Sequence, residues 1–117
     1  MTKYNYREAV CNDIRDYIEE HYGNNWMKEY SSDEFAEMLN DELWIADSVT
    51  GNASGSYTFS AWEAEENISH NLDLLKEAAD EFCCDYSKLL GSAEACDVTI
   101  RCYLLGECIG MVLDEIN

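Results

Sequence analysis

Five acidic residues are the side chains of this sequence whose types and spacing most suggest a binding site. We expect a helix over residues 61–82, with these carboxylates gathered on one of its faces. The set is Glu63, Glu66, Asp73, Glu77 and Asp80. Neighbouring carboxylates on a helix face are about 5–6 Å apart, comparable to the spacing of phosphates along a nucleic-acid strand. Such an acidic ridge can compete with nucleic acid for a basic groove, although an acidic face can equally serve only solubility.

The charge of the whole chain points to the same class of partner. Seven Lys and Arg stand against 25 Asp and Glu, which gives a formal net charge of −18. Binding to phosphates needs a basic footprint that these few cations do not supply, so we expect no direct binding of nucleic acid or of an anionic membrane. A strongly negative field favours fast, salt-sensitive association with a basic surface. The sequence therefore predicts a protein partner with a basic surface.

Cysteine and histidine give weak grounds for metal binding or catalysis. The six cysteines lie at positions 11, 83, 84, 96, 102 and 108 without a CxxC pair, and His21 and His70 are the two histidines. No Asp-x-Asx-x-Asx-Gly loop occurs, and neither histidine has the setting of a base beside a nucleophile. We expect reduced core thiols, with Cys83 and Cys84 at the core edge or partly exposed at a helix end. We predict no metal, no cofactor and no enzymatic activity.

Charge is absent from residues 48–62, although 27% of the chain is charged. Glycine, asparagine and serine in this segment predict a small hairpin or an ordered loop around residues 48–59. We expect the charge to be absent because aromatic and apolar flanking residues pack over the core. Those residues are Trp44, Ile45, Tyr57, Phe59 and Trp62. The alternative is a recognition loop in which Tyr57 and Phe59 contact a partner.

Two amphipathic helices are expected in the N-terminal part of the chain. Apolar residues recur at three- and four-residue steps over 5–22, and Gly23 supplies the stop. Ser31 and Glu34 form a capping box that opens a second helix over 32–43. The buried face of the second helix is predicted to consist of Phe35, Met38, Leu39 and Leu43.

A second capping box, Ser60 with Glu63, opens the long helix over 61–82. The apolar line predicted for this helix is Ala61, Ala64, Ile68, Leu72, Leu75, Ala79 and Phe82. A break at His70 and Asn71 is the alternative to one continuous helix. A short helical turn capped by Asp85 is expected to follow.

The C-terminal segment over 96–116 is apolar nearly all round and keeps helical spacing, so we predict a central buried helix. A strand over 97–103 is the alternative, because residues 98–100 are β-branched. Gly106 and Gly110 lie one turn apart, and we expect them to let another part of the chain approach closely.

These elements together predict a mainly α fold, a single acidic helical domain over residues 1–117. The chain has no proline and six glycines, which removes the usual linkers. The N-terminal residues lack the apolar core of a signal peptide, and no segment reaches the ~20 apolar residues that cross a bilayer. We therefore expect a cytoplasmic protein.

Two stretches carry a resemblance to known sequences. They are LWIADSVTGNASGSYTFSAWEAEENISHNLDLLKEA, residues 43–78, and DVTIRCYLLGECIG, residues 97–110. Both resemble small acidic hypothetical proteins of phages and integrative mobile elements in Firmicutes, and the likeness covers the C-terminal two thirds of the chain. The resemblance implies a mobile-element origin and an accessory role on host machinery, defence systems included, but no activity to carry over.

The functional prediction is an acidic protein-binding module. It would occupy a basic, normally nucleic-acid-binding surface of a host protein through the five carboxylates of the acidic ridge. The alternative is a structural or regulatory adaptor, or a homodimer, that uses the uncharged segment over 49–62 with Tyr57 and Phe59.

Overall fold

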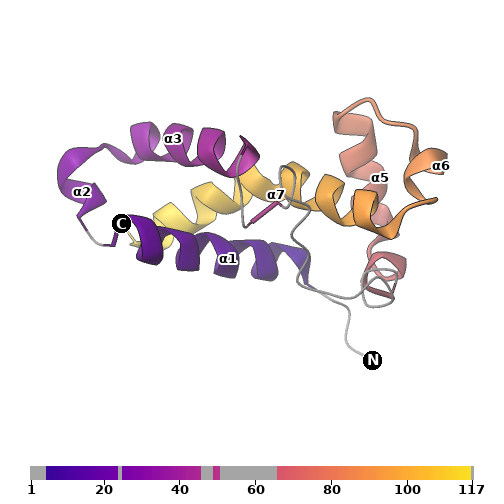
Figure 1. The fold of residues 1–117 in the computed structure, drawn as a ribbon, viewed down its shortest axis with the longest axis horizontal. Helices are drawn as coiled ribbons and strands as arrows, with labels where there is room; N and C mark the ends of the chain where they lie inside the picture. Colours follow the sequence, from indigo (N-terminus) through magenta and orange to yellow (C-terminus); the bar gives the residue numbers. More distant parts are fainter. Residues whose placement is uncertain (1–4, 24, 46–48, 51–65, 117) are drawn as a thin grey trace.

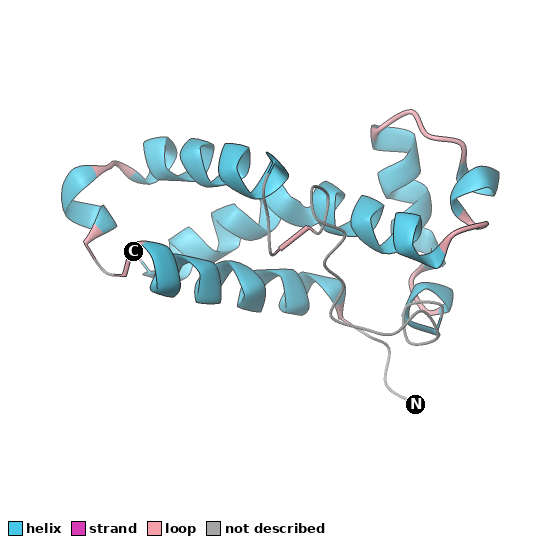
Figure 2. Cartoon of the chain, in the orientation of Figure 1, coloured by secondary structure: helices cyan, strands magenta, loops and turns pink. Residues whose placement is uncertain are grey.

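The structure is a computed structural model that describes residues 5–23, 25–45, 49–50 and 66–116. Figure 1 and Figure 2 show helices joined by turns, and no strand occurs among these residues. The labelled helices are α1 (Tyr6–His21), α2 (Trp26–Glu29), α3 (Ser32–Ile45), α5 (Leu72–Glu81), α6 (Tyr86–Leu89) and α7 (Ala93–Ile116). The predicted mainly α fold class is confirmed. The hairpin or loop expected around residues 48–59 lies outside the described residues, except at Val49 and Thr50.

Helix α7 is the central element, and α1, α3 and α5 all pack against it (Figure 1). Its 24 residues are helical throughout, so the strand alternative over 97–103 is wrong. Residues on several sides of α7 are buried, because neighbouring helices cover it from more than one direction. They include Ile100, Leu104, Leu105, Cys108, Ile109 and Val112. This burial outweighs the weak strand preference of the β-branched residues near its start.

The spacing of the two glycines of α7 predicted that another part of the chain would pack closely against them, and the structure shows no such packing among the described residues. Gly106 and Gly110 are both exposed, and a Cβ added at either position would meet no atom of the described residues within 4 Å. They lie on the side of α7 that no other helix covers in the described part of the chain. The expectation of close intramolecular packing at these glycines is therefore wrong.

Helix α1 runs parallel to α7, and α3 runs antiparallel to both (Figure 1). The side chain of Asn5 caps α1 by accepting a hydrogen bond from the backbone N–H of Glu8 at 3.1 Å. At the other end, the backbone N–H groups of Tyr22 and Gly23 both donate to the carbonyl of Ile18, and Gly23 has a φ of 61°. The predicted helix and its glycine stop are confirmed, because local capping chemistry determines both ends.

Helix α3 begins with the predicted capping box. The backbone N–H of Glu34 donates to Ser31 Oγ at 3.2 Å, and the backbone N–H of Ser31 donates to Glu34 Oε1 at 3.4 Å. Phe35 is fully buried and stacks on Trp26 of α2, with ring centroids 4.3 Å apart. The short helix α2 was not expected from the sequence. It supplies the aromatic side chain that closes the core at this end of the fold.

The segment predicted as one helix over 61–82 is interrupted. Residues 66–69 are helical, the chain turns at His70, and α5 begins after Asn71. The backbone N–H of Asn71 donates to the carbonyl of Ile68, and its side-chain Nδ2 donates to the carbonyl of Asn67, both at 2.8 Å. These bonds stabilise a turn in place of helix continuation. The break considered at His70 and Asn71 is confirmed, and the Ser60–Glu63 capping box lies outside the described residues.

The turn also changes which residues of α5 are buried. Leu75 and Ala79 are buried as predicted, but Leu72 and Phe82 are exposed. The core side of α5 is completed by Leu74 and Ala78.

Helix α6 follows, and its predicted cap is confirmed, because Asp85 Oδ1 accepts from the backbone N–H of Ser87 at 2.9 Å. None of the described helices combines the length and the apolar content needed to cross a membrane.

Candidate functional site

The acidic ridge predicted along residues 61–82 does not form one continuous surface. Glu63 lies outside the described residues. Glu66 precedes the turn at His70 and is partly buried, whereas Asp73, Glu77 and Asp80 are exposed on α5. A non-helical turn between Glu66 and α5 breaks the angular relation that one helix would impose. Of the four described members of the ridge, Asp73, Glu77 and Asp80 therefore share an exposed face on α5, and Glu66 lies apart from them before the turn.

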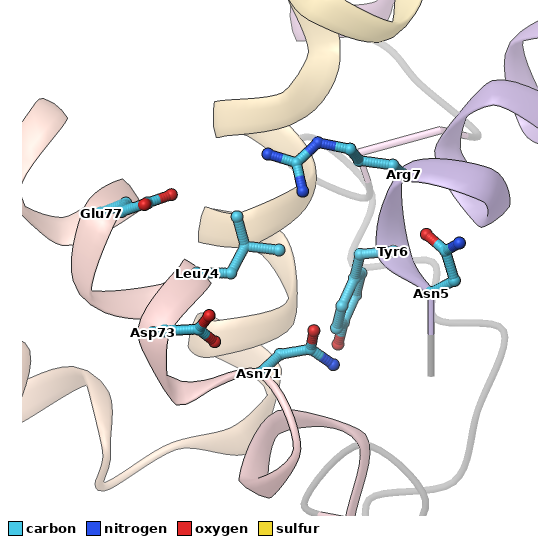
Figure 3. A pocket seen from close by; sticks show the side chains of 7 residues that line it. All are labelled: Asn5, Tyr6, Arg7, Asn71, Asp73, Leu74 and Glu77. Atoms are coloured by element: carbon cyan, nitrogen blue, oxygen red, sulfur yellow. The ribbon is translucent and has the colours of Figure 1, made fainter. Parts of the chain in front are cut away.

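A hollow of about 400 Å³ lies between the start of α1 and the start of α5 (Figure 3). The described residues that line it are Asn5, Tyr6, Arg7, Asn71, Asp73, Leu74 and Glu77. Figure 3 shows Asp73 and Glu77 on the α5 side and Arg7 on the opposite side. The fold thus brings two of the predicted carboxylates to the edge of a concave surface.

The chemistry of this hollow is that of a polar binding surface. Its described lining contains no cysteine, histidine, serine or threonine, so it holds no pairing of such a nucleophile with a histidine base. Arg7 is already engaged, because its Nε donates to Glu107 Oε2 at 2.9 Å. With that charge offset, Asp73 and Glu77 favour a cation or an N–H donor over a phosphate.

The chain has three arginines, and the structure uses all of them between helices. Arg7 pairs with Glu107, and Arg15 forms a two-pronged pair with Glu115 in which Nη2 lies 2.7 Å from Oε2. These two pairs join α1 to α7. The arginine charges therefore do not offset the carboxylates that face outward on α3 and α5.

Helix α3 carries a second acidic face that was left out of the predicted site. Asp33, Glu37 and Asp41 are exposed and spaced four residues apart, so they share one side of the helix. Glu34 is exposed beside them. The four-residue spacing was available in the sequence as a signal. The same spacing is also that of the ordinary solvated face of an amphipathic helix, so by itself it does not identify a binding site.

The expected packing of the aromatic residues around the uncharged segment is wrong for the two residues that the structure describes. Trp44 and Ile45, at the end of α3, are 39% and 67% exposed. Tyr57, Phe59 and Trp62 lie outside the described residues. Val49 and Thr50 are buried, and Thr50 Oγ1 donates to the carbonyl of Leu43 at 3.1 Å. The start of the uncharged segment is therefore held against the core.

A buried polar cluster, which sequence reasoning missed, lies between α1, α7 and Val49. Arg101 is only 4% exposed. Its Nε donates to Asp97 Oδ2 at 3.1 Å, and its Nη1 donates to Asp13 Oδ2 at 3.0 Å and to the Val49 carbonyl at 3.2 Å. The hydroxyl of Tyr6 donates to the other oxygen of Asp97 at 2.7 Å. We call Tyr6, Asp13, Asp97 and Arg101 the Arg101 cluster, and its enclosure within the fold indicates a structural role.

Asp13 is the partly exposed member of this cluster, and its environment sets a pH dependence. Burial raises the pKa of the Asp13 carboxyl above its usual 3.8, Arg101 opposes this shift, and Asp16 and Asp97 add to it. The folded state therefore binds this proton more tightly than the unfolded state. The stability linked to Asp13 is greatest at low pH and decreases as pH rises through the raised pKa.

We expect Asp13→Asn to remove this dependence. At neutral pH the variant should be as stable as wild type or slightly more so, within about 1 kcal/mol, because the partly exposed ion pair and the burial of its charge oppose each other. Urea unfolding of both proteins between about pH 4 and 7 measures the difference. The advantage of the variant should shrink as pH falls. A difference that is constant, or that grows toward low pH, would contradict the prediction.

A second polar contact, at the end of α1, is also structural. Tyr17 Oη donates to Glu42 Oε1 at 2.6 Å, and the hydroxyl of Tyr22 donates to the other oxygen of Glu42. Burial and the neighbouring Glu42 carboxylate raise the pKa of Tyr22 to about 12. Both hydroxyls donate to the same carboxylate and so join the end of α1 to α3.

The described cysteines are free thiols, and four of the six are buried, as expected for core residues. Burial raises the pKa of Cys96, and it raises the pKa of Cys108, which lies near Cys11, to about 12. Cys83 and Cys84 are exposed at the end of α5. Within the described residues, no group of three or more His, Cys, Asp or Glu side chains is arranged to hold a metal ion.

Comparison with known proteins adds no family to these observations. No family model, no curated protein and no solved structure matches the chain.

Proposed function

We propose that this protein is an acidic protein-binding module that occupies a basic surface of a partner, one that normally binds nucleic acid. The observation that carries the proposal is the separation of charge in the fold. The arginines pair between α1 and α7, whereas α3 and α5 present exposed carboxylates to solvent. A surface of this kind attracts a basic partner and repels nucleic acid itself.

The exposed face of α5 is the part of the molecule that fits mimicry of nucleic acid best. Asp73, Glu77 and Asp80 follow one another at four- and three-residue steps on a helix of 10 residues. Their neighbours are about 5–6 Å apart on such a face, close to the separation of successive phosphates. We place the protein in the cytoplasm as a non-enzymatic accessory protein of a mobile element, on the basis of its sequence resemblance and its composition.

The test is a pull-down from a host lysate at low and moderate salt, with DNA or RNA added as a competitor. The α5 variant is Asp73→Asn with Glu77→Gln and Asp80→Asn. A matched control makes the same charge change on α1 with Asp16→Asn, Glu19→Gln and Glu20→Gln, which are also exposed. We expect a nucleic-acid-binding protein to be retained by wild type and by the control. The α5 variant, the higher salt and the competitor should each remove it.

Two outcomes would contradict the proposal. If both variants lose the partner equally, only net charge matters and the face of α5 is a solvated surface. If the contact is insensitive to salt and is lost on changing Tyr57 or Phe59, the adaptor or homodimer that uses the uncharged segment becomes the better explanation.

A further inference from the structure

The C-terminal ends of α3 and α5 lie near each other beside α7 (Figure 1). Exposed apolar side chains gather at this place. The rings of Trp44 and Phe82 have centroids 5.9 Å apart, and Phe82 meets Tyr103 of α7 edge-on at 6.5 Å. Trp44, Ile45 and Phe82 are 39%, 67% and 37% exposed. We call these three residues the aromatic patch. Single exposed apolar residues are common, but a contiguous group from two helices is typical of a contact surface.

The surface beside the patch is hollowed. A concavity of about 500 Å³ lies here, and the described residues that line it are Asn40, Asp41, Trp44 and Ile45. It can receive an apolar side chain from outside the molecule, because Trp44 and Ile45 provide apolar surface and Asn40 and Asp41 provide hydrogen-bond acceptors.

Carboxylates border the patch along α3. Glu37 and Asp41 precede Trp44 by seven and three residues, so they lie on the same side of α3. Asp80 and Glu81, in the last turn of α5, are also exposed and add negative charge to this end of the fold. An apolar centre with an acidic border is therefore the chemistry that this surface offers a partner.

We propose that the aromatic patch binds an amphipathic basic helix of the partner, with apolar residues on the patch and lysine or arginine over the acidic border. The complementary charge selects this occupant, because a second copy of a chain with net charge −18 would bring further negative charge to the same border. Apolar residues at helical spacing supply the anchors of such a contact. The inference rests on the proposed function, since it specifies the kind of basic protein that is bound.

The probe is a fluorescently labelled peptide of about 20 residues with leucine and phenylalanine on one helical face and lysine elsewhere. A scrambled peptide has the same composition without that face, and a third peptide replaces lysine by glutamine. Fluorescence anisotropy at low and moderate salt gives the dissociation constants. Trp44→Ser tests the patch, and Leu90→Ser is the matched control, because Leu90 is 48% exposed on another helix end.

We expect the amphipathic basic peptide to bind at least about tenfold more tightly than the scrambled or glutamine peptide. Trp44→Ser should weaken its binding by a similar factor, and Leu90→Ser should leave it unchanged. Circular dichroism confirms that both variants are folded, which is expected because both side chains are exposed.

Each other outcome overturns the inference and says what replaces it. The amphipathic and scrambled peptides could bind equally well, with a salt dependence and with no effect of Trp44→Ser. In that case the proposed acidic module is supported, but the patch has no role in binding. Tight binding of the glutamine peptide means that the partner is apolar rather than basic. A dimer in sedimentation that Trp44→Ser dissociates assigns the patch to a second copy. If no lysine peptide binds even at low salt, the proposed function fails as well.

Discussion

Replacing Arg101 by methionine is expected to lower the free energy of unfolding by about 3–5 kcal/mol, because it leaves a buried carboxylate without its counter-charge. Asp97 is 1% exposed and depends on Arg101 and Tyr6 for its hydrogen bonds. The Val49 carbonyl would also lose the donor that Arg101 Nη1 supplies. Urea unfolding followed by circular dichroism measures the change, and Arg101→Lys provides a milder variant if methionine prevents folding.

Two further variants distinguish two causes of lost stability. One cause is a buried carboxylate left without its counter-charge, and the other is the removal of any arginine. Arg15→Met removes an equally direct ion pair from the surface, and it should cost less than about 1 kcal/mol because both partners are solvated. Adding Asp97→Asn to Arg101→Met should recover about 1–2 kcal/mol, since no charge is then left buried at that position. The explanation is wrong if the double variant is no more stable than Arg101→Met alone.

The features that the sequence predicted well are those determined within one or two turns of chain. The capping box of Ser31 with Glu34, the Asp85 cap and the stop at Gly23 all depend on neighbours at most five residues away. Periodicity identified α1, α3 and α7 for the same reason, because a helix repeats its buried face every three to four residues. The apolar length of α7 also predicted its central place in the fold.

The features that were missed depend on contacts between residues far apart in the chain. Arg101 meets Asp13 and Val49 across 88 and 52 residues, and no local pattern distinguishes a buried arginine from a solvated one. Burial of the apolar residues along α7 outweighed the strand preference of the β-branched residues near its start. The spacing of Gly106 and Gly110 did not predict their exposure, because whether another helix covers them depends on the tertiary fold.

The sequence predicted the negative charge of the candidate site, but it did not predict which residues the fold brings together there. Composition alone predicted an acidic surface, because acidic residues far outnumber lysine and arginine. The prediction of one continuous acidic helix face was wrong, because the side chain and the backbone N–H of Asn71 form hydrogen bonds that stabilise a turn. This turn separates the helical residues 66–69 from α5. The aromatic patch was missed because Trp44 and Phe82 come together only when α3 and α5 pack on α7. Apolar residues at a helix end more often belong to the core, so the sequence predicts burial for Trp44 and Phe82.

The residue that follows the C-cap of α5, Cys83, has a backbone conformation that is unfavourable for a residue other than glycine. Cys83 has a φ of 56°, in the left-handed region where a Cβ is unfavourable. The backbone N–H of Cys84 donates to the carbonyl of Ala79 at 2.8 Å, and that of Cys83 donates to the carbonyl of Asp80 at 3.3 Å. This is the Schellman ending of a helix, in which the position of Cys83 is usually glycine.

Cys83→Gly is therefore expected to stabilise the fold by about 1 kcal/mol, because the relief of the left-handed strain exceeds the added freedom of glycine in the unfolded chain. The melting temperature should rise by roughly 3–5 °C. Cys83→Ala is the matched control, because it removes the thiol and keeps the Cβ, and its stability should stay near that of wild type. If alanine stabilises as much as glycine, the exposed thiol rather than the backbone limits stability at this helix end.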